Sequence, residues 1–346
     1  MSDKINCIVV KTINDLDSLV HGFNFAKQYK IKYAIILDYE DCKIKKYHEV
    51  LICSIEKINI ILKSIDCIII SDGIPETEND KIKKISKTIL NTNIKLKDLR
   101  NNKQNEKIYK EFLNLPKEYS IIKTPCFLIS GLIENTNKTQ FVYELSKYLN
   151  TYNENPCVIS ANEFASMFGF VKFPTTELNK IFDIDEKYIF LNYFLKRIIE
   201  IYKCTIILIC IPGSYSNPIS PLNKKSEALV KLIELAIDVD YHMHLVPVNY
   251  NDQYLLKNLI DYINSKNTTK IDAVIFSNIY LDMSKPVIDL KDIEKVIVSE
   301  KQNFFIYDSK LSFSTFTVFD KNTYKLLISN IIKKLAIDSN EYRILQ

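Results

Sequence analysis

The chain has 346 residues, of which 47% are hydrophobic and 25% charged, the balance of a globular protein long enough for two domains. Its formal net charge is +4, from 46 basic and 42 acidic residues, which argues against a nucleic-acid partner. No apolar stretch approaches the length of a membrane span, and the N-terminus shows no signal-peptide pattern. We therefore expect a cytoplasmic protein with no membrane partner.

The 8 cysteines are scattered along the chain without a Cys-x-x-Cys pair. Several lie within apolar, strand-like runs, where a free thiol behaves as a small buried hydrophobic group. This pattern favours a reducing compartment over a disulfide framework or a zinc site.

In the first third of the chain, short apolar runs alternate with amphipathic segments. Strands are predicted at 7–10, 34–37 and 67–70, and helices at 16–29, 55–65 and 81–90. This alternation predicts a parallel sheet with crossover helices. The polar, lysine-rich segment 99–120 indicates a helix followed by a linker. We therefore expect an N-terminal domain over residues 1–120 and a C-terminal domain over residues 121–346.

The most informative segment begins at residue 126. An apolar run of strand type, 126–130, leads into a loop that starts at Gly131, and a segment with Phe141 and Leu145 at helical spacing follows. A strand, a glycine-started loop and a helix that opens on Lys138-Thr139 are typical of a phosphate-binding loop (P-loop).

The residues of this loop suit the binding of a phosphorylated ligand. Backbone N–H groups would face an anion at the positive end of the helix, Lys138 would reach the outer phosphates, and Thr139 would ligate Mg²⁺. The expected cofactor is ATP or another nucleotide with Mg²⁺. The candidate binding residues in the loop are Gly131, Glu134, Asn135, Thr136, Asn137, Lys138 and Thr139.

The loop is degenerate. Gly131 precedes the lysine by seven positions, one more than in the common P-loop form, and Asn137 replaces the glycine before the lysine. Asparagine is the non-glycine residue that best tolerates a left-handed backbone, whereas the carboxylate of Glu134 would repel phosphate. The alternative is an ordinary strand–loop–helix connection with a solvent-exposed lysine.

The same alternation continues to the C-terminus. Further strands are predicted at 157–160, 205–211, 243–248, 273–277 and 304–307, and helices at 186–202, 227–237, 254–263 and 324–335. Purely apolar strands fit a sheet that is covered on both faces. The expected fold class is therefore α/β, with two parallel-sheet, Rossmann-like domains, the second of which carries the degenerate P-loop.

The strand at 205–211 occupies the place of the second motif of a nucleotide hydrolase. Such enzymes carry an aspartate near the end of this strand to hold the metal and orient water. Here Cys210 and Ile211 stand at these positions, so we do not expect hydrolysis by the standard mechanism. Pro212 and Gly213 follow as candidate ligand contacts. Gly213 either lets the backbone approach a ligand or forms a tight turn at the strand exit.

Four phenylalanines, at 164, 168, 170 and 173, surround Gly169. They would form either an apolar surface for a peptide or acyl chain, or a loop whose rings pack into the core. We favour the packed loop, because aromatic side chains are mostly buried.

His242 and His244 alternate around Met243, so on a strand both rings face one side. Two imidazoles could share a metal ion, but the neighbouring sequence offers no clear third ligand. A structural or exposed pair is therefore favoured over a metal site.

A resemblance to a known family rests on motifs that occur in one order along residues 124–280. They are Thr124-Pro125, Gly131-Leu132, Glu134, Thr136-Asn137-Lys138, Phe168-Gly169-Phe170, Phe173-Pro174, Asn192 and Ile211-Pro212-Gly213. In these motifs the chain resembles the clostridial-type peptide maturation system proteins, which are encoded beside a radical-SAM enzyme and a short cysteine-rich precursor peptide. The N-terminal third is similar to them in architecture only.

The resemblance implies an accessory role in maturing a ribosomally synthesised, post-translationally modified peptide. The implied partners are the precursor peptide, the radical-SAM maturase, or both. More distantly, the interval from Gly131 to Lys138 is similar to that of the dethiobiotin-synthetase class of P-loop proteins. That similarity implies an active ATP-dependent ligase or kinase as the alternative function and, by analogy, a homodimer. The chain departs from this class at Asn137 and lacks its acidic second motif.

Overall fold

The structure is a computed structural model in which the chain forms two compact units. The first unit comprises residues 1–103 and 163–169, and the second comprises residues 104–162 and 170–346. None of the described helices combines the length and apolar character needed to cross a membrane. The structure describes residues 6–11, 16, 31–38, 45–47, 50–71, 74, 76–90, 92–99, 103–132, 137–162, 165–211, 224–250, 252–277, 279–281, 295–297, 312–318 and 321–344.

The first unit is built on a six-stranded sheet with the order β3-β4-β2-β1-β5-β6. Its neighbouring strands run parallel, except that the edge strand β3 is antiparallel to β4. The strands are β1 (Asn6–Val10), β2 (Ile31–Ile36), β3 (Lys45–Tyr47), β4 (Val50–Cys53), β5 (Cys67–Ile70) and β6 (Lys95–Asp98).

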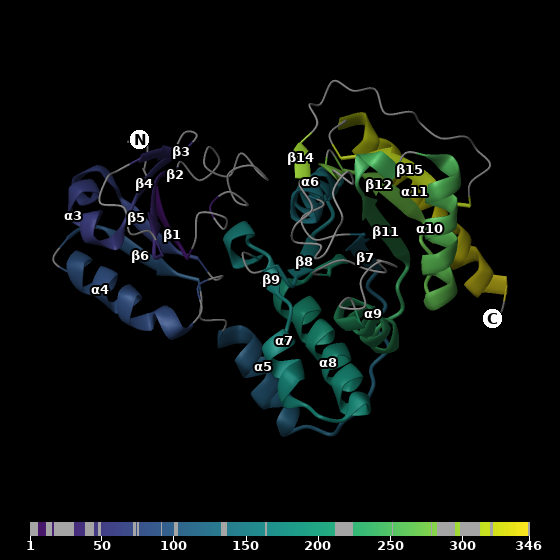
Figure 1. Ribbon diagram of the computed structural model, residues 1–346. Helices are drawn as coiled ribbons and strands as arrows, with labels where there is room; N and C mark the ends of the chain where they lie inside the picture. The colour runs from purple at the N-terminus through teal and green to yellow at the C-terminus, as the bar shows by residue number, and fades with distance from the viewer. Residues whose placement is uncertain are drawn as a thin grey trace. The chain divides into compact units, whose positions relative to one another are not determined.

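Helices cover one face of this sheet through a core rich in isoleucine (Figure 1). In α4, Ile82, Ile85 and Ile89 recur at helical spacing and pack into the cluster that contains Val9 of β1 and Ile68 of β5. The helical segments are η1 (Ile55–Lys57), α3 (Ile58–Ile61), η2 (Leu62–Ser64), η3 (Glu76–Glu78) and α4 (Asn79–Ile89).

Three strands of the first unit were not predicted from the sequence. The strand β6 has the sequence Lys-Leu-Lys-Asp, and all of its residues are exposed at the edge of the sheet. A charged edge strand carries no apolar run, because it has no face to bury. The short strands β3 and β4 were also not expected, and the predicted helix 16–29 lies outside the described residues apart from Leu16.

The second unit is built on a seven-stranded, fully parallel sheet with the order β15-β12-β11-β7-β10-β8-β9. The predicted α/β class with two Rossmann-like sheets is confirmed. The strands are β7 (Cys126–Gly131), β8 (Pro156–Ser160), β9 (Val171–Lys172), β10 (Ile206–Cys210), β11 (Tyr241–Val246), β12 (Ala273–Phe276) and β15 (Ser314–Thr317). A separate antiparallel pair consists of β13 (Ile279–Leu281) and β14 (Lys295–Ile297), and the strand predicted at 304–307 lies outside the described residues.

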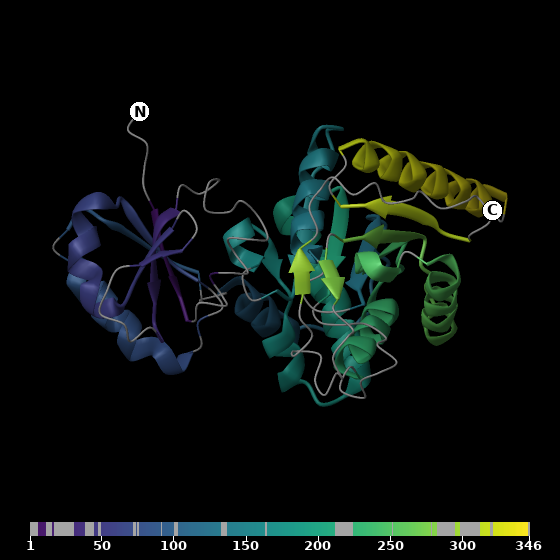
Figure 2. The ribbon, with the colours of Figure 1, turned by 45° about the horizontal axis from the view of Figure 1, so that its top comes forward.

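Helices cover both faces of this sheet. Figure 2 shows α11, in yellow, on one side of the edge strand β15 and its neighbour β12, and α10, in green, on the other side. The helix α6 lies on the same face as α11, where the rings of Phe141 and Tyr324 stack with centroids 5.9 Å apart. The helices are α5 (Lys103–Leu113), α6 (Lys138–Asn150), α7 (Thr175–Lys180), α8 (Ile184–Tyr202), α9 (Lys224–Ala236), α10 (Gln253–Lys266) and α11 (Lys321–Ile344).

The positions of the helices follow from the direction of each connection. The chain passes from β7 through α6 towards β8, and from β10 through α9 in the opposite direction towards β11. Right-handed crossovers that run in opposite directions place their helices on opposite faces of the sheet. The order of strands therefore reverses at the carboxyl end of β7, which is the place where open α/β sheets bind ligands.

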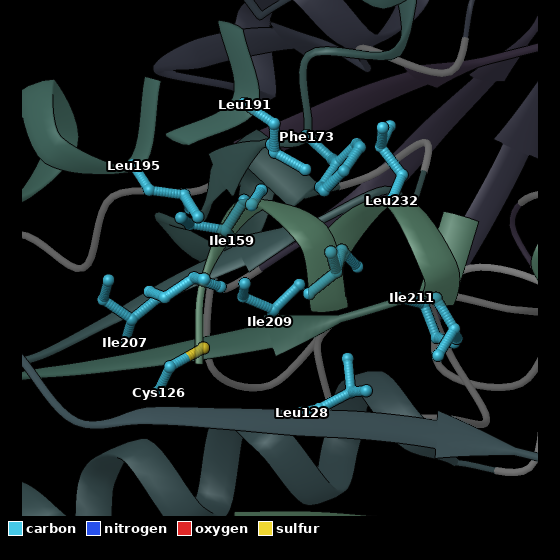
Figure 3. Packing of buried hydrophobic residues seen from close by; sticks show 14 of the residues in the cluster. Cys126, Leu128, Ile159, Phe173, Leu191, Leu195, Ile207, Ile209, Ile211 and Leu232 are labelled. Atoms are coloured by element: carbon cyan, nitrogen blue, oxygen red, sulfur yellow. The ribbon is translucent and has the colours of Figure 1, made fainter. Parts of the chain in front are cut away.

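The larger core lies between the sheet and the helices α7 to α10. The side chains of Ile207 and Ile209 on β10 lie beside Leu128 of β7 and below Leu191 and Leu195 of α8 (Figure 3). These strands are apolar on both faces because helices cover both, as the sequence predicted.

The helix α5 belongs to the second unit. Ile108 and Phe112 are buried in the core cluster of that unit, and the ring of Phe112 lies 5.2 Å from the ring of Phe190. The division of the chain at residue 103 therefore differs from the boundary expected near residue 120. Ile108 and Phe112 anchor the helix of this polar segment in the core of the second unit.

Asn192 fixes the extended segment that connects α5 to β7. Its side chain is fully buried and accepts a hydrogen bond from the N–H of Ser120 at 2.9 Å. Its amide group donates to the carbonyl oxygens of Ser120 at 2.9 Å and of Ala236, in α9, at 2.8 Å. One side chain of α8 therefore forms hydrogen bonds with three backbone groups from two other segments.

Replacing Asn192 with alanine should destabilise the second unit by about 3 kcal/mol or more, because buried backbone groups would lose their partners and a cavity would remain. Urea denaturation measures this cost, and hydrogen exchange at the Ser120 amide should become faster. The exposed Asn258 of α10 is the control, since Asn258→Ala removes no buried partner. Equal effects of the two substitutions would contradict this role of Asn192.

Candidate anion-binding site

The candidate site lies at the carboxyl end of β7, the central strand of the second unit. Gly131 is buried as the last residue of β7, and the N–H of Leu132 donates to the carbonyl of Leu245 at 2.9 Å. After Leu132 the next described residue is Asn137, the N-cap of α6, which begins at Lys138. Glu134, Asn135 and Thr136, which the sequence predicts as loop contacts, lie outside the described residues.

The start of α6 has the backbone geometry expected from the sequence. Asn137 adopts a left-handed conformation with φ 58° and ψ 20°, and its carbonyl accepts from the N–H of Phe141 at 2.8 Å. Asparagine tolerates this conformation better than the branched residues, so it can replace the usual glycine. The left-handed backbone expected at Asn137 is therefore present, and residues 133–136 of the loop lie outside the described residues.

Lys138 is the first residue of α6, and only 7% of it is exposed. The alternative of a solvent-exposed lysine after an ordinary loop is therefore wrong. Its ammonium group lies close enough to His244 and Cys210 to lower the pKa of each side chain, although burial is the main influence on both. The positive charge of Lys138 therefore influences side chains at the carboxyl ends of both β11 and β10.

Thr139 lies beside the end of β8. Its Oγ1 accepts a hydrogen bond from Nδ2 of Asn162 at 3.0 Å. The backbone N–H of Asn162 in turn donates to Oγ of Ser160, the last residue of β8, at 3.2 Å. This chain of contacts connects the first turn of α6 to the neighbouring end of the sheet.

The end of β10 carries neutral groups. Cys210 is buried, and burial raises the pKa of its thiol to about 11, so the thiol is uncharged near neutral pH. Ile211 is buried as well. Neither of these two residues offers a carboxylate at the second-motif position, and Pro212 and Gly213 lie outside the described residues.

A buried hydrogen-bonded cluster lies next to this site. Oγ of Ser130 is 2.7 Å from Nε2 of His242 and 2.7 Å from Nδ1 of His244. His244 pairs with Ser130 in the register of β11 and β7, and all three side chains are fully buried. One ring donates to the serine oxygen while the serine hydroxyl donates to the other ring, so a single hydroxyl partners both neutral imidazoles.

Both imidazoles are held in the neutral form. Burial lowers the pKa of His242 to about 4, with a smaller contribution from the charge of Lys334 and a partial offset from the backbone of Thr269. Burial also lowers the pKa of His244, and the neighbouring His242 and Lys138 add to the effect. Among the described residues no cluster could hold a metal ion, and the structural interpretation of the histidine pair is confirmed.

The phenylalanine-rich segment has the packing role that we favoured from the sequence. Phe168, Phe170 and Phe173 are buried, and Gly169 between them has a positive φ of 76°. Phe164 lies outside the described residues. The described rings fill cores and do not form an exposed apolar surface.

The structure brings Gly131, Asn137, Lys138 and Thr139 together at one end of the sheet, as predicted. Sequence reasoning missed Asn162 and Ser160, which reach this place only because β8 lies on the far side of β10, two strands from β7. The polar residues that end the apolar run of β8 are the signal that could have indicated them.

The stability of the second unit should fall as the pH is lowered from about 6.5 towards 4. The folded state keeps both rings neutral, whereas the histidines of the unfolded chain take up protons in this range. His242 alone contributes on the order of 3 kcal/mol that is present above pH 6.5 and lost towards pH 4.

The double variant H242Q/H244N retains amide groups near the nitrogens that contact Ser130 but cannot titrate. Urea denaturation between about pH 7 and pH 4 should show a smaller loss of stability for this variant than for the original chain. The same pH dependence in both proteins would show that the histidine pair does not carry the effect.

No protein-family model and no curated protein matches the chain. Solved structures that align with it include a DUF1611 family protein from Anabaena variabilis, with 13% identity, a TM-score of 0.47, and coverage of 80% of this chain and 88% of that one. Chloroplast FtsY from Physcomitrella patens aligns with 13% identity, a TM-score of 0.31, and coverage of 64% and 72%. The signal recognition particle receptor FtsY from Elizabethkingia anophelis aligns with 12% identity, a TM-score of 0.29, and coverage of 77% and 82%. These likenesses are too low to carry an argument about family or function.

Proposed function

We propose that the second unit binds a phosphate-bearing ligand, foremost a nucleotide, at the start of α6. The observation that carries this proposal is the burial of Lys138 at the first position of that helix. A lysine is seldom buried to this extent, because removing an ammonium group from water is costly. Its position at the end of the central strand coincides with the reversal of strand order, where α/β sheets bind ligands.

The electrostatics of this helix end favour an anion. The N-terminus of an α-helix carries a partial positive charge, and the first N–H groups have no carbonyl partner within the helix. A buried ammonium group at the same end adds a second positive charge, and the two together attract an anion more strongly than either does alone.

The first turn of α6 carries no acidic side chain, and the side chain of its N-cap residue, Asn137, does not cap it by a hydrogen bond. Two other helices of the same unit begin differently. Asp183 caps α8 by accepting from two backbone N–H groups, and Asp252 caps α10 by accepting from one. The N-cap residue of α6 therefore supplies no acceptor of the kind that Asp183 and Asp252 supply to α8 and α10.

Binding is better supported than catalysis. An ATP-dependent ligase or kinase needs groups that stabilise the transferred phosphoryl group and hold its metal ion. Cys210 and Ile211 supply neither at the end of β10. We therefore expect that bound ATP is not hydrolysed during a binding measurement.

An accessory role in peptide maturation is the second part of the proposal, and it is supported only by the order of motifs in the sequence. In that role the chain would bind the precursor peptide or its radical-SAM maturase. Co-expression of all three proteins tests it, because peptide modification should be lost when this chain is omitted. Full modification in its absence would overturn the accessory role and would leave the anion site unaffected.

Lys138→Met should weaken the binding of ATP or inorganic triphosphate by about tenfold or more, since the variant keeps much of the apolar stem but loses the charge. In the original chain the ligand should raise the melting temperature, because binding to the folded state alone stabilises it. Titration calorimetry and thermal unfolding measure the two effects.

Lys147→Met is the matched control on the same helix. Lys147 lies in the last turn of α6, where it is exposed and forms an ion pair with Glu144. This substitution should leave anion binding unchanged. Equal binding by both variants, or binding by neither them nor the original chain, would overturn the proposed function.

A further inference from the structure

The metal ion expected beside the P-loop places definite demands on its ligands. Mg²⁺ in phosphate sites is held by oxygen atoms, usually one or two carboxylates together with a hydroxyl group, phosphate oxygens and water. Thr139 was expected to provide the hydroxyl ligand. The surroundings of Thr139 therefore show whether the donor set fits such an ion.

The observed contact at Thr139 does not fit. Nδ2 of Asn162 donates a hydrogen bond to Oγ1 of Thr139 at 3.0 Å, so an N–H group is directed at the oxygen that would face the metal. An amide N–H carries partial positive charge and cannot ligate a cation. Because Oγ1 accepts from Asn162, the hydroxyl hydrogen of Thr139 can be donated to another acceptor. The hydroxyl group is therefore suited to donate a hydrogen bond to an anion.

The other groups that the structure describes near this contact are neutral or positive. Ser160 accepts from the backbone of Asn162, and the Cys210 thiol stays protonated near neutral pH because burial raises its pKa to about 11. The charge of Lys138 reaches both Cys210 and His244. Among the residues that the structure describes at the ends of β8 and β10, hydroxyl, amide and thiol groups stand where a metal site needs carboxylates.

We propose that this site holds its phosphate ligand without a divalent metal ion. Lys138, the hydroxyl group of Thr139 and the N–H groups of the first turn of α6 neutralise and bind the phosphate directly, and Asn162 orients the hydroxyl as a donor. This inference rests on the proposed function, since it specifies the charge state of the ligand at the same site. Free ATP or triphosphate is then the bound form, and its magnesium complex is not required.

Titration calorimetry with ATP and with inorganic triphosphate, each in excess EDTA and in excess Mg²⁺, tests this inference on the full chain. Affinity in EDTA should equal the affinity in Mg²⁺ within about threefold or exceed it. Binding that is about tenfold tighter in Mg²⁺, or seen only there, would overturn the metal-free site while leaving the proposed function intact.

The variant Asn162→Asp tests the same inference from the opposite side. A carboxylate beside Thr139 should weaken binding in EDTA by about tenfold or more through repulsion of the phosphate, and Mg²⁺ should restore part of the affinity. Asn258→Asp on the exposed face of α10 is the control and should behave as the original chain in both buffers. An Asn162→Asp variant that binds equally in EDTA and in Mg²⁺ would contradict the role assigned to Asn162.

Absence of binding has a separate meaning. If neither ligand binds in either buffer, and the original chain and Lys138→Met do not differ, the proposed function fails and the metal-free site fails with it. This outcome differs from magnesium-dependent binding, so the two failures are distinguishable.

Discussion

A positive charge buried at the positive end of a helix is the constraint on which the second unit depends. Lys138 is the first residue of α6, and only 7% of it is exposed. The left-handed backbone of Asn137 starts the helix there, and the parallel sheet places this helix end where the strand order reverses. This arrangement places two sources of positive charge at one end of the sheet, which favours the binding of an anion there.

The parts of this arrangement that depend on neighbouring residues could be predicted from the sequence. Apolar runs indicated β7 and β10, helical spacing indicated α6, and the known tolerance of asparagine for a left-handed backbone indicated that the loop could close at Asn137. Each of these signals lies within a short window of sequence, and local chemistry determines each of them.

The parts that depend on strand order could not be predicted. Asn162 reaches Thr139 only because β8 lies one strand beyond β10, and no sequence window contains that information. The charged strand β6 was missed because an edge strand without a buried face shows no apolar pattern. The alternation of residues along a strand was enough to place His242 and His244 on one side. Their partner, Ser130, became apparent only from the register of β11 with β7.

The most direct test of this account is a crystal structure of the full chain with inorganic triphosphate. The account predicts a phosphate group at the start of α6, within hydrogen-bond distance of Lys138 Nζ and Thr139 Oγ1. A structure in which a carboxylate of the chain occupies that place and pairs with Lys138, while the triphosphate is absent or lies elsewhere, would contradict it.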